Sequence, residues 1–386
     1  MKLKSSPADF QVTELSRVTA SGGPFALYQL EKESLGTPEA IHAILQHWNL
    51  PRHRISYGGM KDRHAQTTQW ITIQNGPRQD LRERSFQLLY QGQTGRAFTP
   101  HDISGNRFAL RLRGIEPSAR PNLDLRLQSI RSAGVVNYFD DQRFGSLGQS
   151  GRFIAEPWCR GEYEQALYLA LAESNSHDRP RERQQKEILR ECWGNWDQCK
   201  QRLDRSHRRS IVTYLVDHPQ DFKRAIALLR SDLRGIYVAA FQSGLWNRWL
   251  SQIIQQRFGT SVWQLPSLLG PLEVPQFDSA SEEQVNWMRG VRLPLPSARQ
   301  HDWPAEETPL LDEILQQYNL QRSEIRLKYP RDTFFSKGVR SGWLCPSQLR
   351  FEWQPDDAHA GKQALLLSFE LPPGSYATMI IKVLQS

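Results

Sequence analysis

Cysteine is scarce in this chain: its 386 residues include four, Cys159, Cys192, Cys199 and Cys345. None forms a C-x-x-C pair, and the spacing of Cys192 and Cys199 matches no common zinc site. Four scattered thiols are too few for a disulfide framework, so we expect a protein of the reducing cytoplasm. The sequence shows no cluster of metal ligands either, and we expect neither a metal nor another cofactor.

Long apolar runs are absent as well. No segment approaches the roughly 18–20 apolar residues of a membrane-spanning helix. The opening MKLKSSPADF has two lysines but no apolar stretch after them, so we expect no secretion signal and no membrane span. A content of 39% hydrophobic and 23% charged residues is typical of a globular protein. The length favours two or three domains.

The charge of the chain is strongly positive, with a net charge of +8 and a sequence pI of about 9.4. Arginines dominate segments such as RERQQKEILR, KQRLDRSHRR and RFALRLRG. The guanidinium fork suits phosphate and stacks on bases, and twelve tryptophans and eleven tyrosines add planar faces. A basic surface that serves only solubility is the alternative, but the balance favours a polyanionic partner.

The segment GNRFALRLRG predicts a strand with two unlike faces, because side chains two residues apart point to the same side of a sheet. The apolar face carries Phe108, Leu110 and Leu112, and the basic face carries Arg107, Arg111 and Arg113. We expect the apolar face to pack in a core and the three arginines to face solvent or phosphate.

The stretch YGGMKDRHAQTTQW lies between a predicted helix and a predicted strand. The helix has Thr37 as its expected N-cap and a proline at its first position. The strand covers residues 70–73. Functional residues tend to lie on loops held between rigid elements, so this loop is a candidate site.

Asp62, in this loop, has three possible roles: it could cap a turn, bind a metal or do chemistry. Lys61 and Arg63 disfavour a bound cation, and His64 would be a lone ligand. Positive neighbours favour the ionised carboxylate that a nucleophile or base requires. The residues alone favour the plain turn and leave chemistry open.

The middle of the chain has a different texture. Helical patterns such as EYEQALYLALAES alternate with proline-rich stretches such as LPSLLGPLEVPQF. We predict a helix-rich domain of residues 153–325, inserted into a domain made of residues 1–152 and 326–386. The very polar segment 179–209 matches no motif and could be an insertion that adds RNA contacts.

Six blocks, in order, resemble those of the TruD family of pseudouridine synthases. They are PADFQVTEL, YGGMKDRHAQTTQ, HDISGNRFALRLR, GVVNYFDDQRFG, FQSGLWNRWLS and LPPGSYATMII. One block would be weak evidence, but six at both ends of the chain are strong. The resemblance implies an α+β fold: a pseudouridine synthase-type mixed, largely antiparallel sheet with flanking helices, plus an inserted helix-rich TRUD domain.

The resemblance also implies the activity, which is isomerisation of uridine to pseudouridine in RNA. The name of the family implies position 13 of tRNA as the target. The bond from ribose C1′ to uracil N1 breaks, the base turns, and C5 joins C1′, with no cofactor. The family's essential aspartate falls on Asp62, which would attack C1′ or remove the C2′ proton of a flipped nucleotide. We therefore expect a cytoplasmic monomer that acts on tRNA and does not bind a membrane.

The same resemblance implies five supporting residues: Phe10, Lys4, Lys61, Asn137 and Phe139. Lys4 would pair with the aspartate, and Lys61 lies beside it. Asn137 would hold the loop or a substrate group, and Phe139 would stack on the base. Plain alternatives are core positions for the two phenylalanines and a turn for the asparagine.

Arg143, in the GVVNYFDDQRFG block, is a further candidate for phosphate contact. The sequence departs from the family at Ala8, where the usual glutamate is absent and a local charge is lost. Two rival functions remain. A non-catalytic RNA-binding or RNA-folding factor would not need Asp62, and a metal-dependent nuclease would need clustered carboxylates.

Overall fold

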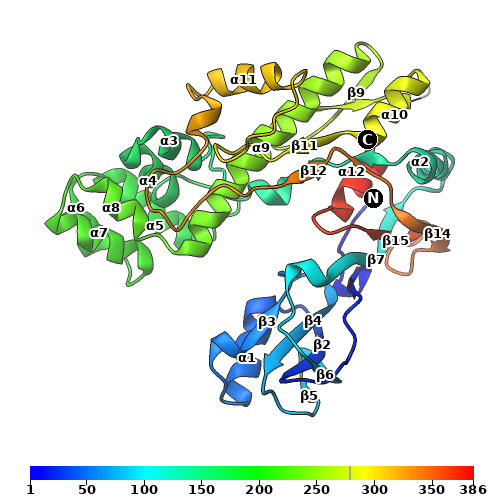
Figure 1. Ribbon diagram of the computed structural model, residues 1–386, viewed down its shortest axis with the longest axis horizontal. Helices are drawn as coiled ribbons and strands as arrows, with labels where there is room; N and C mark the ends of the chain where they lie inside the picture. Colours follow the sequence, from blue (N-terminus) through cyan, green and yellow to red (C-terminus); the bar gives the residue numbers. More distant parts are fainter. Residues whose placement is uncertain (278–279) are drawn as a thin grey trace. The chain divides into compact units, whose positions relative to one another are not determined.

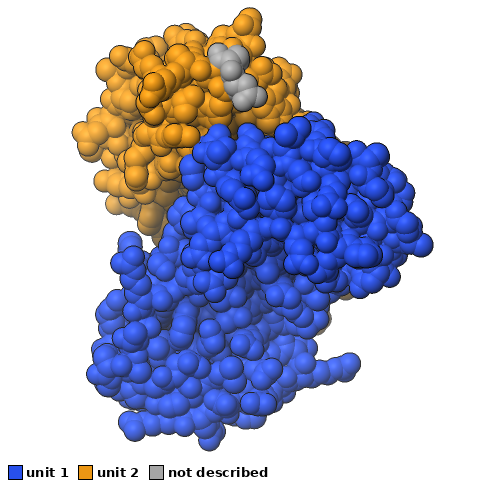
Figure 2. Space-filling model, turned by 90° about the vertical axis from the view of Figure 1, so that its right-hand side faces the viewer, with its two compact units in different colours: residues 1–135, 344–386 blue, residues 136–343 orange. Residues whose placement is uncertain are grey.

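The chain divides into two compact units in the computed structural model, which describes residues 1–277 and 280–386. Unit 1 comprises residues 1–135 and 344–386, and unit 2 comprises residues 136–343 (Figure 1, Figure 2). Both unit boundaries lie inside the segments predicted for the first domain. The assignment of one catalytic and one inserted domain stays a prediction.

Unit 1 is built on a nine-stranded sheet. Its elements are β1 (Phe10–Ser16), β2 (Phe25–Glu33), α1 (Thr37–His47), β3 (Ile55–Tyr57), β4 (Gln66–Gln74), β5 (Leu81–Glu83), β6 (Phe86–Thr94), β7 (Ile103–Ile115), α2 (Arg120–Ala133), β14 (Ser347–Pro355), β15 (Gln363–Leu371) and α12 (Ala377–Gln385). The strand order is β14-β15-β7-β1-β4-β2-β6-β5, with β3 paired to β4. Strands β1 and β4 are parallel, and the other neighbours are antiparallel. The predicted mixed, largely antiparallel sheet is confirmed.

Two hydrophobic cores cover the same face of this sheet. One joins β1, β7 and β15 to helices α2 and α12, and the other joins β2, β4 and β6 to α1 (Figure 1). Val12 belongs to the first core and pairs with Thr67 of β4. Alternation along β4 then puts Ile71 and Ile73, which belong to the second core, on the same side. The loop between β3 and β4 reaches this face where the two cores meet, since its Ala65 is buried in the first core.

Unit 2 is rich in helices. Its elements are α3 (Ala155–Arg160), α4 (Tyr163–Leu171), α5 (Pro180–Cys192), α6 (Trp196–Arg202), α7 (His207–Asp217), α8 (Phe222–Ala227), α9 (Ser231–Phe258), β9 (Val262–Leu265), β10 (Leu272–Pro275), α10 (Glu282–Gly290), β11 (Arg292–Pro294), α11 (Thr308–Gln316) and β12 (Val339–Ser341). Two short strands, β8 (Val135–Val136) and β13 (Trp343–Leu344), lie where the chain passes between the units. Within the described residues, no helix is long and apolar enough to span a membrane.

The polar segment 179–209 forms two helices, α5 and α6, and the start of α7. Cys192 at the end of α5 and Cys199 in α6 form a disulfide. The expectation of four scattered thiols is therefore wrong for this pair. A spacing of seven residues does not by itself show that the turn between α5 and α6 brings the two cysteines together. Cys159 is buried and Cys345 exposed, and both are free thiols.

Strand β7 shows the predicted apolar face, since Phe108, Leu110 and Leu112 are buried. Its basic face differs from the prediction at Arg113, which is only 9% exposed. Leu112 pairs with Leu365 but Ile115 pairs with Gln363, so β7 has an extra residue here. Such a bulge ends the strict alternation of side chains.

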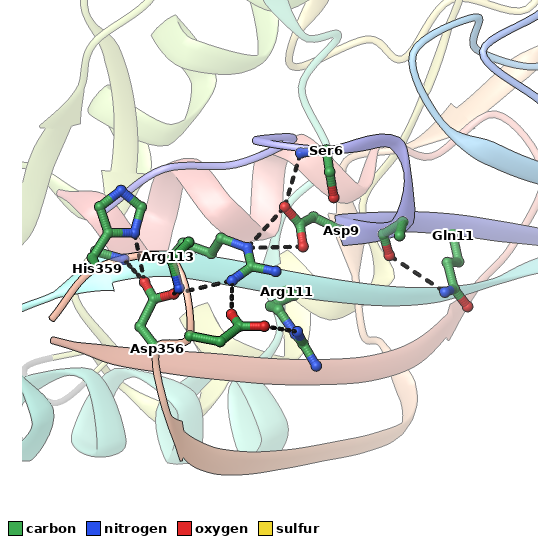
Figure 3. A network of polar contacts seen from close by, with 11 residues as sticks. Ser6, Asp9, Gln11, Arg111, Arg113, Asp356 and His359 are labelled. Atoms are coloured by element: carbon green, nitrogen blue, oxygen red, sulfur yellow. Dashed lines mark hydrogen bonds and ion pairs between the residues drawn. The ribbon is translucent and has the colours of Figure 1, made fainter.

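Arg113 nevertheless stays on the side of β7 that carries Arg111, because both guanidinium groups contact Asp357. It is buried because a set of carboxylates surrounds its guanidinium (Figure 3). Its Nε donates to both oxygens of Asp9 at 3.0 Å, and its Nη1 donates to Asp356 at 3.0 Å and to Asp357. Burial by itself raises the pKa of Asp356, but hydrogen bonds from the backbone N–H groups of Gly114 and Ala358 and from other donors lower it well below the usual range. Arg113 is therefore a structural cation and not a phosphate contact.

Replacing Arg113 by Met is expected to lower the free energy of unfolding by about 3–5 kcal/mol, because Asp9 and Asp356 would stay buried without their cation. The matched control is Arg107→Met, whose pair with Glu370 lies at the surface. We expect it to cost about 0–1 kcal/mol. Urea denaturation at neutral pH measures both, and equal losses would contradict the structural role of Arg113.

Candidate active site

The loop of residues 58–65, here called the Asp62 loop, connects β3 to β4. Its first residue must be small, because a Cβ on Gly58 would lie 2.5 Å from Cδ1 of Ile103. Met60 at the tip is exposed. The loop thus begins in close contact with the sheet and then turns outward.

Two buried side chains hold the backbone of the Asp62 loop. The Thr37 hydroxyl accepts the backbone N–H of Lys61 at 3.0 Å, and it donates to Oε1 of Gln69 at 2.8 Å. The Gln69 amide in turn donates to the carbonyl of Gly59 at 3.2 Å. Thr37 was predicted as the N-cap of α1, but Gly36 occupies that position. The Thr37 hydroxyl serves the loop instead.

The side chain of Lys61 points inward and neutralises a buried carboxylate. Its Nζ lies 2.6 Å from Oε2 of Glu14, whose side chain is 0% exposed, and it donates to Oδ1 of Asn106 at 2.9 Å. The other Glu14 oxygen accepts the backbone N–H of Trp70 at 3.0 Å. A buried charge that lost its partner would cost several kcal/mol, so this pair fastens the loop to β1 and β7.

Lys32 of β2 lies beneath the loop and is 3% exposed. Its ammonium donates to the carbonyls of Leu35 at 2.7 Å, Asp62 at 2.9 Å and Lys61 at 3.4 Å. Burial lowers the pKa of Lys32 to about 8, although the negative charges of Asp62 and Glu39 oppose the shift. The three donors of the ammonium are therefore matched by three carbonyls, two of them in the Asp62 loop.

These anchors leave the Asp62 carboxylate facing outward, with its side chain 43% exposed. Oδ2 lies 2.6 Å from Nζ of Lys4, and Oδ1 has no partner in the described part of the chain. The Lys4 ammonium also lies 4.0 Å from the ring centroid of Phe10. Phe10 is buried and packs edge-on against Phe108, so its ring is a core residue that also supports Lys4.

The segment that carries Lys4 is held on both sides. The backbone of Lys2 exchanges two hydrogen bonds with Arg113, at 2.8 and 3.0 Å, and the backbone N–H of Ser6 donates to Asp9 at 2.9 Å. Between these points Lys4 has a φ of 60°, in the left-handed region that side chains disfavour. The Arg113 cluster therefore supports the backbone position from which Lys4 reaches Asp62.

Asn137 and Phe139 belong to unit 2 and form a cluster around Arg340 of β12. The Asn137 amide donates to the carbonyl of Ser341 at 2.9 Å, and its oxygen accepts from Arg340 at 2.8 Å. The Arg340 guanidinium lies 4.0 Å from the ring centroid of Phe139, which packs edge-on against Trp246. Both predicted residues are buried and held by this arginine.

The other candidates for phosphate contact have different surroundings. Arg107 pairs with Glu370 at 2.7 Å, and Arg111 lies 3.7 Å from Asp357. Arg143 lies 5.6 Å from the ring centroid of Phe139. In contrast to Arg113, these side chains remain at least partly accessible.

Sequence reasoning missed Glu14, Lys32, Gln69 and Arg340. A charged residue on the apolar side of a strand pattern was the available signal for Glu14 and Lys32, since an unpaired charge does not stay in a core. For Arg340 the sequence held no such signal.

Chemically, the arrangement presents one accessible carboxylate beside an ammonium, on a loop whose backbone is fixed. This suits a nucleophile or a base, because the position of the reacting atom is set before substrate binds. Among residues 1–277 and 280–386, no group of three or more His, Cys, Asp or Glu side chains could hold a metal ion.

A solved structure has the same fold. The putative tRNA pseudouridine synthase D (TruD) of Methanosarcina mazei superposes with a TM-score of 0.73, covering 100% of this chain and 93% of that one at 21% identity. The architecture is thus that of a pseudouridine synthase fold.

Residues 1–384 match the family model described as tRNA pseudouridine synthase D (TruD). The chain therefore belongs to the TruD family, and it is a tRNA pseudouridine synthase, an isomerase. A probable tRNA pseudouridine synthase D 2 of Methanocaldococcus jannaschii is 29% identical over 394 residues, 99% of this chain and 91% of the relative. The tRNA pseudouridine synthase D of Leptospira interrogans is 29% identical over 393 residues, 98% and 95% of the two chains.

The ionisation of Lys32 is expected to appear in stability measurements. Its pKa is about 8 in the folded protein and 10.5 when the side chain is not buried. The unfolded chain therefore keeps the proton to higher pH. The cost of the buried charge is present in full below pH 8 and is relieved as the pH rises from about 8 to 10.5.

Relative to Lys32→Met, which has no group titrating there, wild type should gain roughly 3 kcal/mol of unfolding free energy across this interval. Chemical denaturation at a series of pH values gives the difference, which cancels the titration of other groups. A difference that is flat or that falls with pH would contradict the buried ammonium.

Proposed function

We propose that this enzyme converts uridine to pseudouridine at position 13 of tRNA, with Asp62 as the catalytic carboxylate. The observation that carries the proposal is the Asp62 loop: buried contacts from Thr37, Lys32 and Lys61 fix its backbone, and its only carboxylate faces outward. The family membership of residues 1–384 supports the reaction class.

Asp62 acts on the ribose of a flipped uridine, either by attacking C1′ or by removing the C2′ proton. The C1′–N1 bond breaks, the uracil turns, and C5 bonds to C1′. The hydrogen on C5 then leaves as a proton and N1 carries a proton, so the reaction is an isomerisation. Oδ1 is the oxygen available to the ribose, because Lys4 contacts Oδ2.

Lys4 orients the Asp62 carboxylate, and the contact at 2.6 Å supports this role. Phe10 supports Lys4 through its ring. Phe139 is the proposed stacking partner of the displaced base, although its ring is buried beneath Arg340 in this structure, and Asn137 holds the Arg340 guanidinium in place. The outward-facing Arg107, Arg111 and Arg143 are candidates for phosphate contact.

The proposed setting is a cytoplasmic monomer that acts on tRNA without a metal. The main rival is an RNA-binding or RNA-folding factor that does no chemistry. That rival would have no use for a carboxylate held outward by buried contacts, whereas a pseudouridine synthase depends on one.

Tritium release from unmodified tRNA labelled at uracil C5 tests the proposal. Wild type should release tritium. Asp62→Asn should release none even when the product of enzyme concentration and incubation time is about 10⁴-fold higher, because the amide neither attacks C1′ nor accepts the C2′ proton. Affinity for tRNA should change less than about threefold, since one surface carboxylate among many charges contributes little to phosphate binding.

Asp80→Asn is the matched control, because Asp80 is an exposed carboxylate of the same unit that accepts the backbone N–H of Tyr90. It should release tritium at the wild-type rate. Tritium release by Asp62→Asn at that rate would exclude the aspartate from chemistry. Binding of tRNA without release by wild type would favour the rival.

A further inference from the structure

Unit 2 contains a groove of about 570 Å³ that the proposed reaction does not use. It lies between segments 297–299 and 325–335, and the backbone N–H of Ala298 donates to the carbonyl of Ile325 at 3.0 Å to hold them together. Ile325 and Phe335 line it and are buried. The groove therefore has an apolar floor on a fixed backbone.

The rim of this basic groove carries four cations: Arg299, Arg326, Lys328 and Arg331. All four residues are exposed. In the part of the chain that the structure describes, no carboxylate lines the groove and none pairs with these four side chains. Four cations around one concave surface, without counter-charges, produce a local positive potential that attracts anions.

The acidic residues next to these cations in the sequence are engaged elsewhere. Asp332 accepts two hydrogen bonds from Arg234, at 2.7 and 2.9 Å. Glu324 accepts the backbone N–H of Gln321 at 2.9 Å. Asp332 is therefore paired with an arginine outside the rim, and the Glu324 carboxylate pairs, among the described residues, with none of the four rim side chains.

An aromatic ring lies among the cations. Phe334 lines the groove and is 56% exposed, and the Arg299 guanidinium lies 5.0 Å from its ring centroid. A single exposed phenylalanine has little meaning by itself. Beside four cations it completes the composition of a single-stranded nucleic-acid site, in which cations follow the phosphates and an aromatic face takes a base.

We propose that the basic groove binds RNA, with phosphates on Arg299, Arg326, Lys328 and Arg331 and an unstacked base on Phe334. The inference rests on tRNA as the substrate and adds a docking surface for it on unit 2. The groove contributes affinity and register and takes no part in the chemistry. RNA is favoured over an acidic protein segment because the exposed ring offers a stacking face, which an acidic peptide does not use.

The test compares tRNA binding by wild type with that of the triple variant Arg326→Gln, Lys328→Gln, Arg331→Gln. Fluorescence anisotropy between about 50 and 200 mM salt gives the Kd and its salt dependence. The Kd should rise at least tenfold, and the slope of log K against log salt should become shallower by about 2, as expected for the loss of three phosphate contacts. Phe334→Ala should weaken binding about fivefold or more without changing the slope.

The control triple variant Arg181→Gln, Arg202→Gln, Arg230→Gln removes the same charge from unit 2. These three arginines pair with carboxylates outside the groove. Its Kd should change less than about threefold, because these arginines lie outside the groove and are already paired with carboxylates, so RNA gains little from them. An equal loss in the two triple variants would mean a net-charge effect and would overturn the proposal.

Tritium release at saturating tRNA separates this inference from the proposed function. The groove variant should keep the wild-type kcat and lose only kcat/KM. A wild type that binds tRNA through the groove but releases no tritium would refute the function and leave the groove intact. Polyglutamate serves as the probe for an acidic protein segment. Unchanged tRNA affinity in the groove variant, or a loss of polyglutamate binding without a loss of tRNA binding, would overturn the RNA assignment. Lys328→Gln alone, with a slope change of about 1, replaces the triple variant if that one unfolds.

Discussion

The position of Asp62 depends on buried charges that its own loop neutralises. Glu14 projects into the side of the sheet that the helices cover, where an unpaired carboxylate would be very costly. Lys61 supplies the missing cation, and it can do so only when the loop lies close to β1. The residue next to Asp62 is therefore fixed by the stability of the sheet itself. Lys32 adds a second ammonium, which donates to the carbonyls of Lys61 and Asp62 in the loop. The same buried ion pair and hydrogen bonds thus stabilise the folded sheet and fix the backbone of the Asp62 loop.

A second buried cation, Arg113, supports the position of Lys4, the residue that pairs with Asp62. Arg113 gathers Asp9 and Asp356, which come from opposite ends of the chain. The N-terminal segment that passes this cluster delivers Lys4 to Asp62. Lys4 and Asp62 are consequently positioned by two separate buried ion pairs of unit 1, and disturbance of either pair would reach the Asp62 carboxylate.

The basic residues of the chain divide into classes that the net charge conceals. Arg113 and Lys61 neutralise buried acids, Arg340 stacks on Phe139, and Arg107 balances a surface carboxylate. The rim of the basic groove carries four cations that pair with no carboxylate in the described structure. A polyanion would be attracted most strongly to the rim cations, since the charges of these side chains are not compensated by carboxylates.

Much of this was predictable from the sequence, and the limits follow from the range of the interactions. Alternation predicted the apolar side of β7, and the six blocks indicated the family and the sheet. The sequence also placed Asp62 on a loop before a strand, but it missed the short strand β3 that precedes the loop. These features depend on neighbours a few residues apart or on motifs. The supports of Asp62 come from Glu14, Lys32 and Thr37, residues far away in the chain, and only the pairing of strands brings them together. The burial of Arg113 likewise depends on Asp9 and Asp356, which lie near opposite ends of the chain, so no local pattern contains it. The sequence by itself thus determined the family, the apolar side of β7 and the candidate carboxylate, whereas tertiary structure decided which charges are buried and paired, because burial is a property of packing between distant segments.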